Sequence, residues 1–236
     1  MYISRIALNP ARLEAKKLLA SPACMHSAVE HAFPPSSPRN DSEGRILWRV
    51  DILKESHQIW LYVVSPDKPD FSHVVEQAGW PLHPEWETRD YQPLLGRIAL
   101  GQHWAFRLRA NPVRKVKNDL GRSENPAVIG KIMGEVTAAQ QLKWLSDRAE
   151  QYGFSIDGSG DDLQCQVKNR RKERFRHGNG TVTLSTAQFD GNLTVTNADL
   201  FRKALTHGIG RAKGFGCGLL TVAPIHVGSA AKGTSE

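Results

Sequence analysis

RILWRVDILKESHQIWLYVVS, residues 45–65, contains two apolar, β-rich runs separated by four polar residues, KESH. The runs at 45–53 and 58–65 each have the length of a strand, and a short polar connection between two such runs is typical of a β-hairpin. We therefore predict two antiparallel strands here, and the segments on either side extend the pattern.

The flanking segments complete a βαββαβ order. Residues 3–8 (ISRIAL) have a strand pattern, and Asn9 and Pro10 then suit the N-cap and first turn of a helix that begins in RLEAKKLL. After the hairpin, residues 70–79 suit a short helix closed by glycine, and residues 93–100 (PLLGRIAL) suit a further strand.

The second half of the chain begins in the same way. WAFRLRA (104–110) alternates apolar residues with arginine, as a half-exposed strand does. GEVTAAQQLKWLSDRAEQYG (134–153) has apolar residues at three- and four-residue steps and predicts an amphipathic helix. A strand pattern follows at LQCQVK (163–168).

The remaining segments finish a second βαββαβ order. TVTLSTAQF (181–189) predicts a strand, and Asp190-Gly191 before NLTVT predicts a tight hairpin turn. Asn197 suits the N-cap of a helix that Gly208 ends, and CGLLTVAP (217–224) predicts the final strand.

Two such units predict an α+β fold with two tandem ferredoxin-like (βαββαβ, RRM-like) domains. We expect the first domain at residues 1–100 and the second at 101–226. Residues 227–236 have too little apolar content to pack and are expected to be a disordered tail. This architecture serves enzymes, RNA binders and regulatory domains, so functional residues must identify the activity.

Composition narrows the functional classes. The 236 residues carry a formal net charge of +7, so a polyanion is the first partner to consider. Three cysteines at unrelated spacings offer neither a disulfide framework nor a CxxC metal pair. The N-terminus becomes charged too early for a secretory signal, and no apolar run is long enough to span a membrane. We expect a cytoplasmic protein with no membrane association, no metal and no cofactor.

The positive charge is concentrated in three segments. VKNRRKERFRHGNG (167–180) has six Lys or Arg against one acid, and FRLRANPVRKVK (106–117) has five and no acid. In HGIGRAKGFGCGLLTV (207–222), glycines would let backbone N–H groups approach a phosphate, beside Arg211 and Lys213. The alternatives are solvated surfaces for the two runs, and a helix C-cap with a bulged strand for the glycines. Together the three segments favour a phosphate-rich ligand.

These residues resemble the Cas6e (CasE or Cse3) family of CRISPR-associated endoribonucleases. The similarity lies in MYISRIAL at the start, MHSAVEHAFP at 25–34, FRLRANPVRK at 106–115 and GIGRAKGFGCGLLTVAP at 208–224, and it spans most of the chain. The resemblance implies tandem ferredoxin-like domains, recognition of the CRISPR repeat stem-loop RNA and cleavage of precursor crRNA beside it. It also implies that the protein retains its product within the Cascade complex, whose subunits would be its partners.

The expected chemistry needs no metal, because RNA carries its own nucleophile in the 2′-hydroxyl. A histidine suits the required proton transfers, and cations or backbone N–H groups stabilise charge on the phosphorane. The products would be a 2′,3′-cyclic phosphate, or a 3′-phosphate after ring opening, and a 5′-hydroxyl.

Among nine histidines, the resemblance selects His26 as the catalytic residue. The family's histidine lies shortly after the first helix in an H-x-x-x-x-H-x-F-P context, which His26, His31 and Phe33-Pro34 match. His31 is interpreted as a packing or capping residue. The alternative for His26 is an ordinary histidine on a helix surface.

The sequence does not identify a second catalytic residue. The family often has a tyrosine three residues before the histidine, whereas this sequence has Ala23. Lys213, Arg211 or another basic position would then stabilise the transition state.

The long basic run lies between two predicted strands, so it predicts a basic β-hairpin in the second domain that follows the phosphates of an RNA stem. Phe175 and His177 could each stack on a base. The alternative for Phe175 is that it anchors the hairpin to the sheet. The predicted RNA-binding residues are Lys168, Arg170, Arg171, Lys172, Arg174, Arg176, Arg107, Arg109, Lys115, Gly208, Gly210, Arg211, Lys213, Gly214 and Gly216.

Three other functions were weighed. A non-catalytic RNA-binding subunit of a ribonucleoprotein would have the same fold, with His26 incidental. A metal-dependent nuclease lacks support, because there is no HExxH, no CxxC and no dense acidic cluster. A small-molecule-binding or acylphosphatase-like tandem domain would show no salt-dependent RNA affinity. Product formation in EDTA separates the first two from a metal-independent endoribonuclease.

Overall fold

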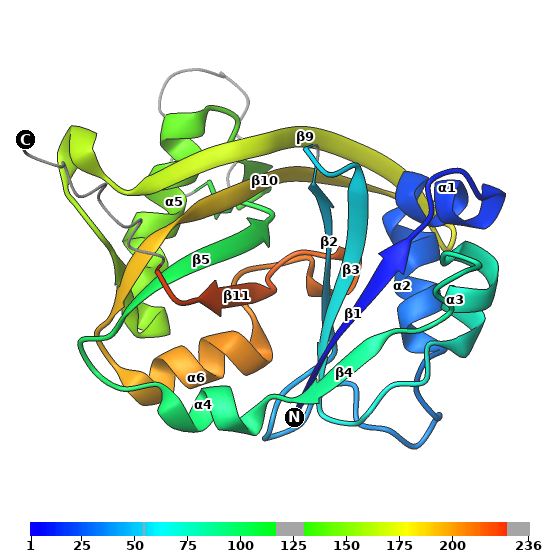
Figure 1. Ribbon diagram of the computed structural model, residues 1–236. Coiled ribbons are helices and arrows are strands. Elements are labelled where there is room, and N and C mark those ends of the chain that lie inside the picture. Colours follow the sequence, from blue (N-terminus) through cyan, green and yellow to red (C-terminus); the bar gives the residue numbers. More distant parts are fainter. Residues whose placement is uncertain (54, 117–129, 226–236) are drawn as a thin grey trace, which may run out of the picture.

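The computed structural model describes residues 1–53, 55–116 and 130–225, and it contains two antiparallel sheets side by side (Figure 1). The first sheet has the strand order β2-β3-β1-β4. Three helices pack on one of its faces, and a fourth follows its last strand. The elements of this unit are β1 (Tyr2–Leu8), α1 (Leu13–Ala20), α2 (Pro22–Glu30), β2 (Leu47–Leu53), β3 (Gln58–Ser65), α3 (Ser72–Ala78), β4 (Glu87–Asp90) and α4 (Gln92–Arg97).

The second sheet has the order β11-β5-β10-β8, and β9 also pairs with β10. Its elements are β5 (His103–Ala110), α5 (Ala138–Ala149), β8 (Phe154–Ile156), β9 (Cys165–His177), β10 (Gly180–Val195), α6 (Ala198–His207) and β11 (Leu220–Ala223). A small two-stranded sheet and three 3₁₀ helices complete the described chain: β6 (Val113–Lys115), β7 (Ile132–Gly134), η2 (Glu150–Tyr152), η3 (Gly160–Asp162) and η4 (Lys213–Phe215).

Each sheet places its first strand between the second strand of the central hairpin and the last strand, which is the ferredoxin-like arrangement. The predicted α+β fold with two such units is therefore confirmed. The first sheet is built from residues 2–90 and the second from residues 103–223. The predicted tail, residues 227–236, lies outside the described residues.

The prediction of a strand at residues 93–100 was wrong. The last strand of the first unit is the polar segment β4, which pairs only with β1 at the edge of the sheet. Residues 92–97 instead form α4, because a proline in the first turn favours a helix and Leu95 packs in the core. The apolar pattern was real, but it belongs to a helix.

The start of the first helix also differs from the prediction. The side chain of Asn9 accepts a hydrogen bond from the backbone N–H of Ala11, so it closes a turn, and α1 begins only at Leu13. A second helix, α2, was not predicted. It begins with Pro22 in its first turn, and the Ser21 hydroxyl caps it by accepting from Cys24.

The predicted turn at Asp190-Gly191 does not exist, because β10 continues through both residues. Asp190 accepts two hydrogen bonds from the Arg107 guanidinium of the neighbouring strand. Gly191 allows a close approach of another segment, since a Cβ there would lie 2.1 Å from the Gln164 carbonyl oxygen. The basic run was predicted to connect two strands. In the structure it is itself part of strand β9.

The two units share a packed interface. The face of the first sheet that carries Leu47 and Val64 lies in the same apolar core as Leu108 and Phe189 of the second sheet. The buried Arg49 crosses this interface and donates to the backbone oxygens of Leu219 and Arg107. The opposite face of the first sheet packs against α1, α2 and α3. No helix among the described residues is long and apolar enough to cross a membrane.

Candidate active site and RNA interface

The glycine-rich segment, residues 208–218, joins α6 to β11 and packs tightly against the first unit. Gly216 has φ +73° and faces Trp48, so a Cβ there would lie 2.4 Å from the indole ring. The Trp48 indole N–H donates to the Gly214 carbonyl oxygen at 3.2 Å. Gly208 has φ +74° and is packed against Leu47 of β2. Gly208 and Gly216 are buried and hold this segment in place, and their contact with RNA stays a prediction.

This packing gives a stability prediction for Gly216→Ala. The substitution combines a positive φ with a clash against Trp48, and we expect it to lower the free energy of unfolding by about 2–5 kcal/mol. Gly101→Ala is the matched control, because Gly101 has φ +78° with nothing within 4 Å of its Cβ position. It should cost only about 1–2 kcal/mol. Equal shifts in denaturant midpoint for both variants would refute the packing role.

His26 lies in α2, and its imidazole faces the glycine-rich segment. The side chain is 31% exposed. The α-carbon of Gly214 packs beside the ring, since a Cβ there would lie 3.6 Å from the His26 Cε1 atom. His31, at the C-cap of the same helix, is exposed and its Nδ1 lies 2.6 Å from the Ser27 carbonyl oxygen. The structure therefore puts His26 at the junction of the two units and leaves His31 outside it.

Phe215 connects three elements at this junction. Its ring contacts His26 of α2 edge-on with ring centres 5.9 Å apart. It also contacts Phe175 and His177 of β9, at 5.0 Å and 5.1 Å. The glycine-rich segment thus holds β9 beside the catalytic candidate, and Phe175 acts as an anchor of the hairpin.

The pKa of His26 is lowered from its ordinary value, first because the ring is partly buried. The positive charges of His177 and Arg45 lower it further, whereas the carboxylate of Glu30 opposes them. A Glu30 oxygen lies 3.9 Å from His26 Nδ1, and its other oxygen accepts from Arg39 at 2.6 Å. At neutral pH the imidazole is therefore neutral, which is the form that accepts a proton.

Arg45 lies close enough to this imidazole to lower its pKa, and Lys213 lies close to Arg45. The pKa of Lys213 is lowered, first by burial and then by the charge of Arg45. Arg45 precedes β2, and its buried Nε has no hydrogen-bond partner among the described residues. Among the described residues, no carboxylate oxygen lies within 4 Å of a side-chain nitrogen of Arg45 or Lys213. Lys213 and Arg45 therefore form a positive cluster without a neutralising partner, which suits a phosphate.

Sequence reasoning missed Arg45. It stands alone between acidic and apolar residues, so neither a charge run nor the family resemblance singled it out. Its backbone N–H donates to the Thr206 oxygen at the end of α6, which brings it to the glycine-rich segment. This long-range contact, which the sequence does not show, is what places Arg45 at the site.

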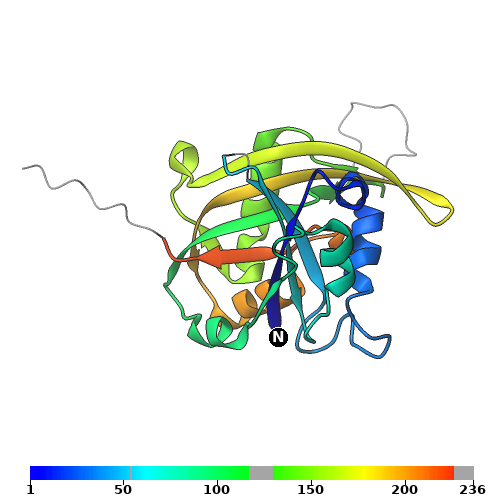
Figure 2. The same cartoon turned by 45° about the vertical axis from the view of Figure 1, so that its right-hand side comes forward.

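Strand β9 carries the exposed positive charge. Its residues alternate between faces, so Arg171, Glu173, Phe175 and His177 share the face toward the glycine-rich segment. In Figure 2 the yellow β9–β10 hairpin runs along the molecule, and its tip projects past the blue helices. The exposed basic residues of the strand are Lys168, Arg170, Arg171, Lys172, Arg174 and Arg176.

Arg107 and Arg109, two of the predicted RNA contacts, each bind several internal partners. The Arg107 guanidinium donates to Asp190 and lies 3.3 Å from Asp51. Arg109, with a side chain only 19% exposed, binds both oxygens of Glu173 and donates to the Phe215 and Gly216 carbonyl oxygens. These bonds hold both guanidinium groups in place, and direct RNA contact by either residue stays a prediction.

The other predicted contacts differ in position. Arg211 and Lys115 are exposed, and Gly210 and Gly214 are half-buried. Lys115 lies on β6. In the described ranges, no three His, Cys, Asp or Glu side chains are grouped closely enough to hold a metal ion.

Fold and site together define a tandem ferredoxin-like protein with a neutral histidine, an unneutralised cation pair and an exposed basic hairpin at one junction. The sequence model of the family described as "CRISPR associated protein" matches residues 1–224. The chain belongs to this family, in its Cas6e (Cse3 or CasE) branch, which confirms the resemblance found in the sequence.

The individual relatives agree with this assignment. The chain is 27% identical over 230 residues to the CRISPR-associated endoribonuclease Cse3 of Thermus thermophilus, covering 95% of this chain and 100% of the relative. It is 27% identical over 228 residues to the CRISPR system Cascade subunit CasE of Escherichia coli, with coverage of 95% and 100%. A solved structure of Cse3 bound to a 19-nucleotide RNA has a TM-score of 0.77 at 26% identity, covering 95% of this chain and all of that one.

Proposed function

We propose that this chain is a metal-independent endoribonuclease that binds the CRISPR repeat stem-loop, cleaves precursor crRNA beside it and retains the product. The observation that carries the proposal is the junction around Phe215, where the His26 imidazole packs beside Gly214 and Phe215, within reach of the charge of Arg45 and next to basic strand β9. The relatives support it, because one is named an endoribonuclease and another a Cascade subunit.

In the proposed reaction, His26 accepts the proton of the 2′-hydroxyl and the freed oxygen attacks the adjacent phosphorus. The bond from phosphorus to the 5′-oxygen breaks, and the imidazolium returns the proton to that oxygen. Lys213 and Arg45 stabilise the negative charge that develops on the phosphorane. The products are a 2′,3′-cyclic phosphate, which can open to a 3′-phosphate, and a 5′-hydroxyl.

The direction of the His26 pKa shift gives a pH prediction. Cleavage should rise with pH and level off, with an inflection below about 6.5, because only the neutral imidazole accepts a proton. Glu30→Gln should move the inflection to lower pH, since Glu30 raises the pKa. His177→Ala should move it to higher pH. Single-turnover rates across pH measure this, and unchanged inflections in both variants would contradict the assignment.

The basic hairpin gives a salt prediction. If Arg176 contacts a phosphate, Arg176→Gln should reduce the slope of log affinity against log salt by about 0.7–0.9. Lys203→Gln is the control, because Lys203 is an exposed cation on α6, away from β9 in Figure 1. Titrations of a stem-loop RNA at several salt concentrations measure both slopes. If the slope for Arg176→Gln equals that of the wild type, Arg176 does not contact an RNA phosphate.

The function is tested by incubating a labelled repeat stem-loop with the protein in EDTA and analysing the ends of the products. A single cut that leaves a cyclic phosphate and a 5′-hydroxyl supports the proposal. Tight binding without a cut would support the second candidate, a non-catalytic RNA-binding subunit. The proposed substrate is a transcript, so we place the protein in the cytoplasm with Cascade subunits as its partners.

A further inference from the structure

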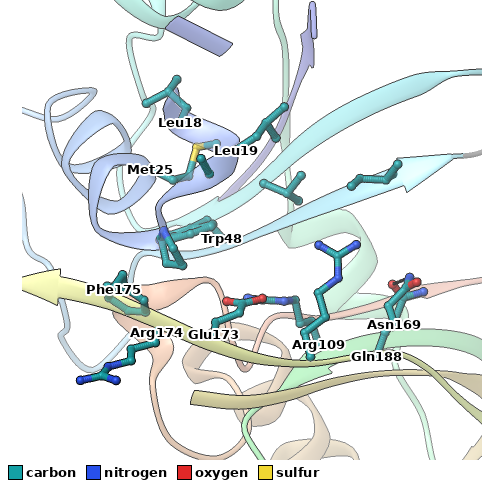
Figure 3. A pocket seen from close by; sticks show the side chains of 15 residues that line it. Leu18, Leu19, Met25, Trp48, Arg109, Asn169, Glu173, Arg174, Phe175 and Gln188 are labelled. Atoms are coloured by element: carbon teal, nitrogen blue, oxygen red, sulfur yellow. Dashed lines mark hydrogen bonds and ion pairs between the residues drawn. The ribbon is translucent and has the colours of Figure 1, made fainter. Parts of the chain in front are cut away.

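A cavity of about 390 Å³ lies beside the proposed active site, between the first unit and the β9–β10 hairpin. Figure 3 shows its two walls. Leu18, Leu19, Met25 and Trp48 form one side, and Arg109, Glu173, Asn169 and Gln188 form the other. An apolar wall that faces fixed polar groups is typical of a site for a flat, partly polar molecule.

One end of the cavity approaches the residues around His26. Met25 lines it and directly precedes His26 in α2. Phe175 also lines it and packs on Phe215, which contacts His26. The cavity therefore begins near Phe175, beside the His26 junction, and extends along β9 to Asn169, which at six strand residues is about 20 Å away.

The polar wall is held rigidly by a chain of hydrogen bonds. The Asn169 amide N–H donates to the Gln188 carbonyl oxygen at 3.0 Å. The Gln188 amide in turn donates to both Asp190 oxygens at 2.9 Å, and Arg107 fixes Asp190. These bonds determine the orientation of the Asn169 amide. Its carbonyl oxygen has no partner among the described residues and remains available as an acceptor.

The backbone at Asn169 is unusual for a strand. Asn169 has φ +46°, and the register of β9 against β10 shifts between Thr186 and Gln188, opposite this position. A β-bulge redirects a side chain, and a positive φ in a residue other than glycine is a strained conformation that concentrates at functional sites. The distortion and the free acceptor therefore occur at one residue, on the wall of the cavity.

We propose that the Asn169 end of this cavity binds one unpaired nucleobase of the RNA, a few nucleotides from the scissile phosphate, an inference that rests on the proposed endoribonuclease function. The apolar wall covers the face of the base, and the Asn169 oxygen accepts a hydrogen bond from an exocyclic amine. Sequence-specific RNA recognition commonly uses splayed-out bases in this way, and asparagine suits an adenine edge. The exposed Arg171, which also lines the cavity, faces the backbone of that nucleotide.

The test uses a stem-loop RNA with a 2′-deoxy scissile nucleotide, so that binding is measured without cleavage. An abasic ribose replaces each unpaired nucleotide of this RNA in turn. We expect one abasic position to weaken binding by about tenfold or more, in line with the loss of one recognised base. Asn169→Gly, which suits the positive φ, should weaken binding of the unmodified RNA but have little further effect on that abasic RNA.

Asn179→Gly is the control, because it removes an exposed amide of the same hairpin outside the cavity. Its effect should be the same on the abasic and unmodified RNAs. If no abasic position weakens binding, or if Asn169→Gly and the abasic site act independently, the nucleobase site is wrong while the endoribonuclease proposal stands. If the wild type does not bind the stem-loop at all, both fail together.

Discussion

His26→Ala is expected to lower the rate constant of cleavage by about 10²–10⁴-fold, which is the usual contribution of a positioned acid–base group. The loss occurs because the His26 imidazole combines a lowered pKa with a position against Phe215 and the glycine-rich segment. Affinity for the stem-loop should change little, since the exposed cations of β9 are untouched. Single-turnover cleavage and equilibrium binding of the same RNA separate the two effects.

His31→Ala is the control for this experiment. It removes an imidazole from the same helix, but one that is exposed and bound to its own backbone at Ser27. Its cleavage rate should match the wild type. If His26→Ala cuts as fast as the wild type, the catalytic assignment is wrong even though the family membership remains.

Arg45→Met should lower the plateau rate of cleavage by about 10²–10³-fold, the range for removal of one group that stabilises transition-state charge. It should also shift the inflection of the pH profile upward, because the charge of Arg45 lowers the pKa of His26. The buried position of its Nε next to Lys213, without a partner in the described chain, is the reason to expect both effects.

The pH profile distinguishes this role from a structural one. Arg89→Met is the control, because Arg89 lies on the edge strand β4 and its side chain is 80% exposed. It should change neither the rate nor the inflection. A lower rate for Arg45→Met with an unchanged inflection would mean that Arg45 supports the fold and not the charge of the site.

Local patterns were sufficient to predict most of the fold. The hairpin at residues 45–65 and the capped helix that starts after Asn197 are confirmed, because each rests on residues that are close in sequence. The prediction failed at β4 and at Asp190-Gly191. A polar edge strand has no apolar alternation, and an Asp-Gly pair can continue a strand when an arginine binds the aspartate.

The site was less accessible to sequence reasoning. The resemblance pointed to His26, and the charge runs pointed to β9, but the contacts that join them come from residues far apart in the chain. The glycines were interpreted as phosphate ligands, whereas Gly208 and Gly216 are needed for packing against Leu47 and Trp48. Arg45 and the bulge at Asn169 leave no local signature, because both depend on long-range pairing.

The central claim is that the RNA supplies the nucleophile and that no metal takes part. The most direct measurement compares cleavage, in EDTA, of a stem-loop RNA with its counterpart that has one 2′-deoxy nucleotide at the scissile position. We expect the wild-type protein to bind both RNAs with similar affinity and to cut only the unmodified one. Cleavage of the 2′-deoxy RNA at the same position, or cleavage that requires added metal, would contradict it.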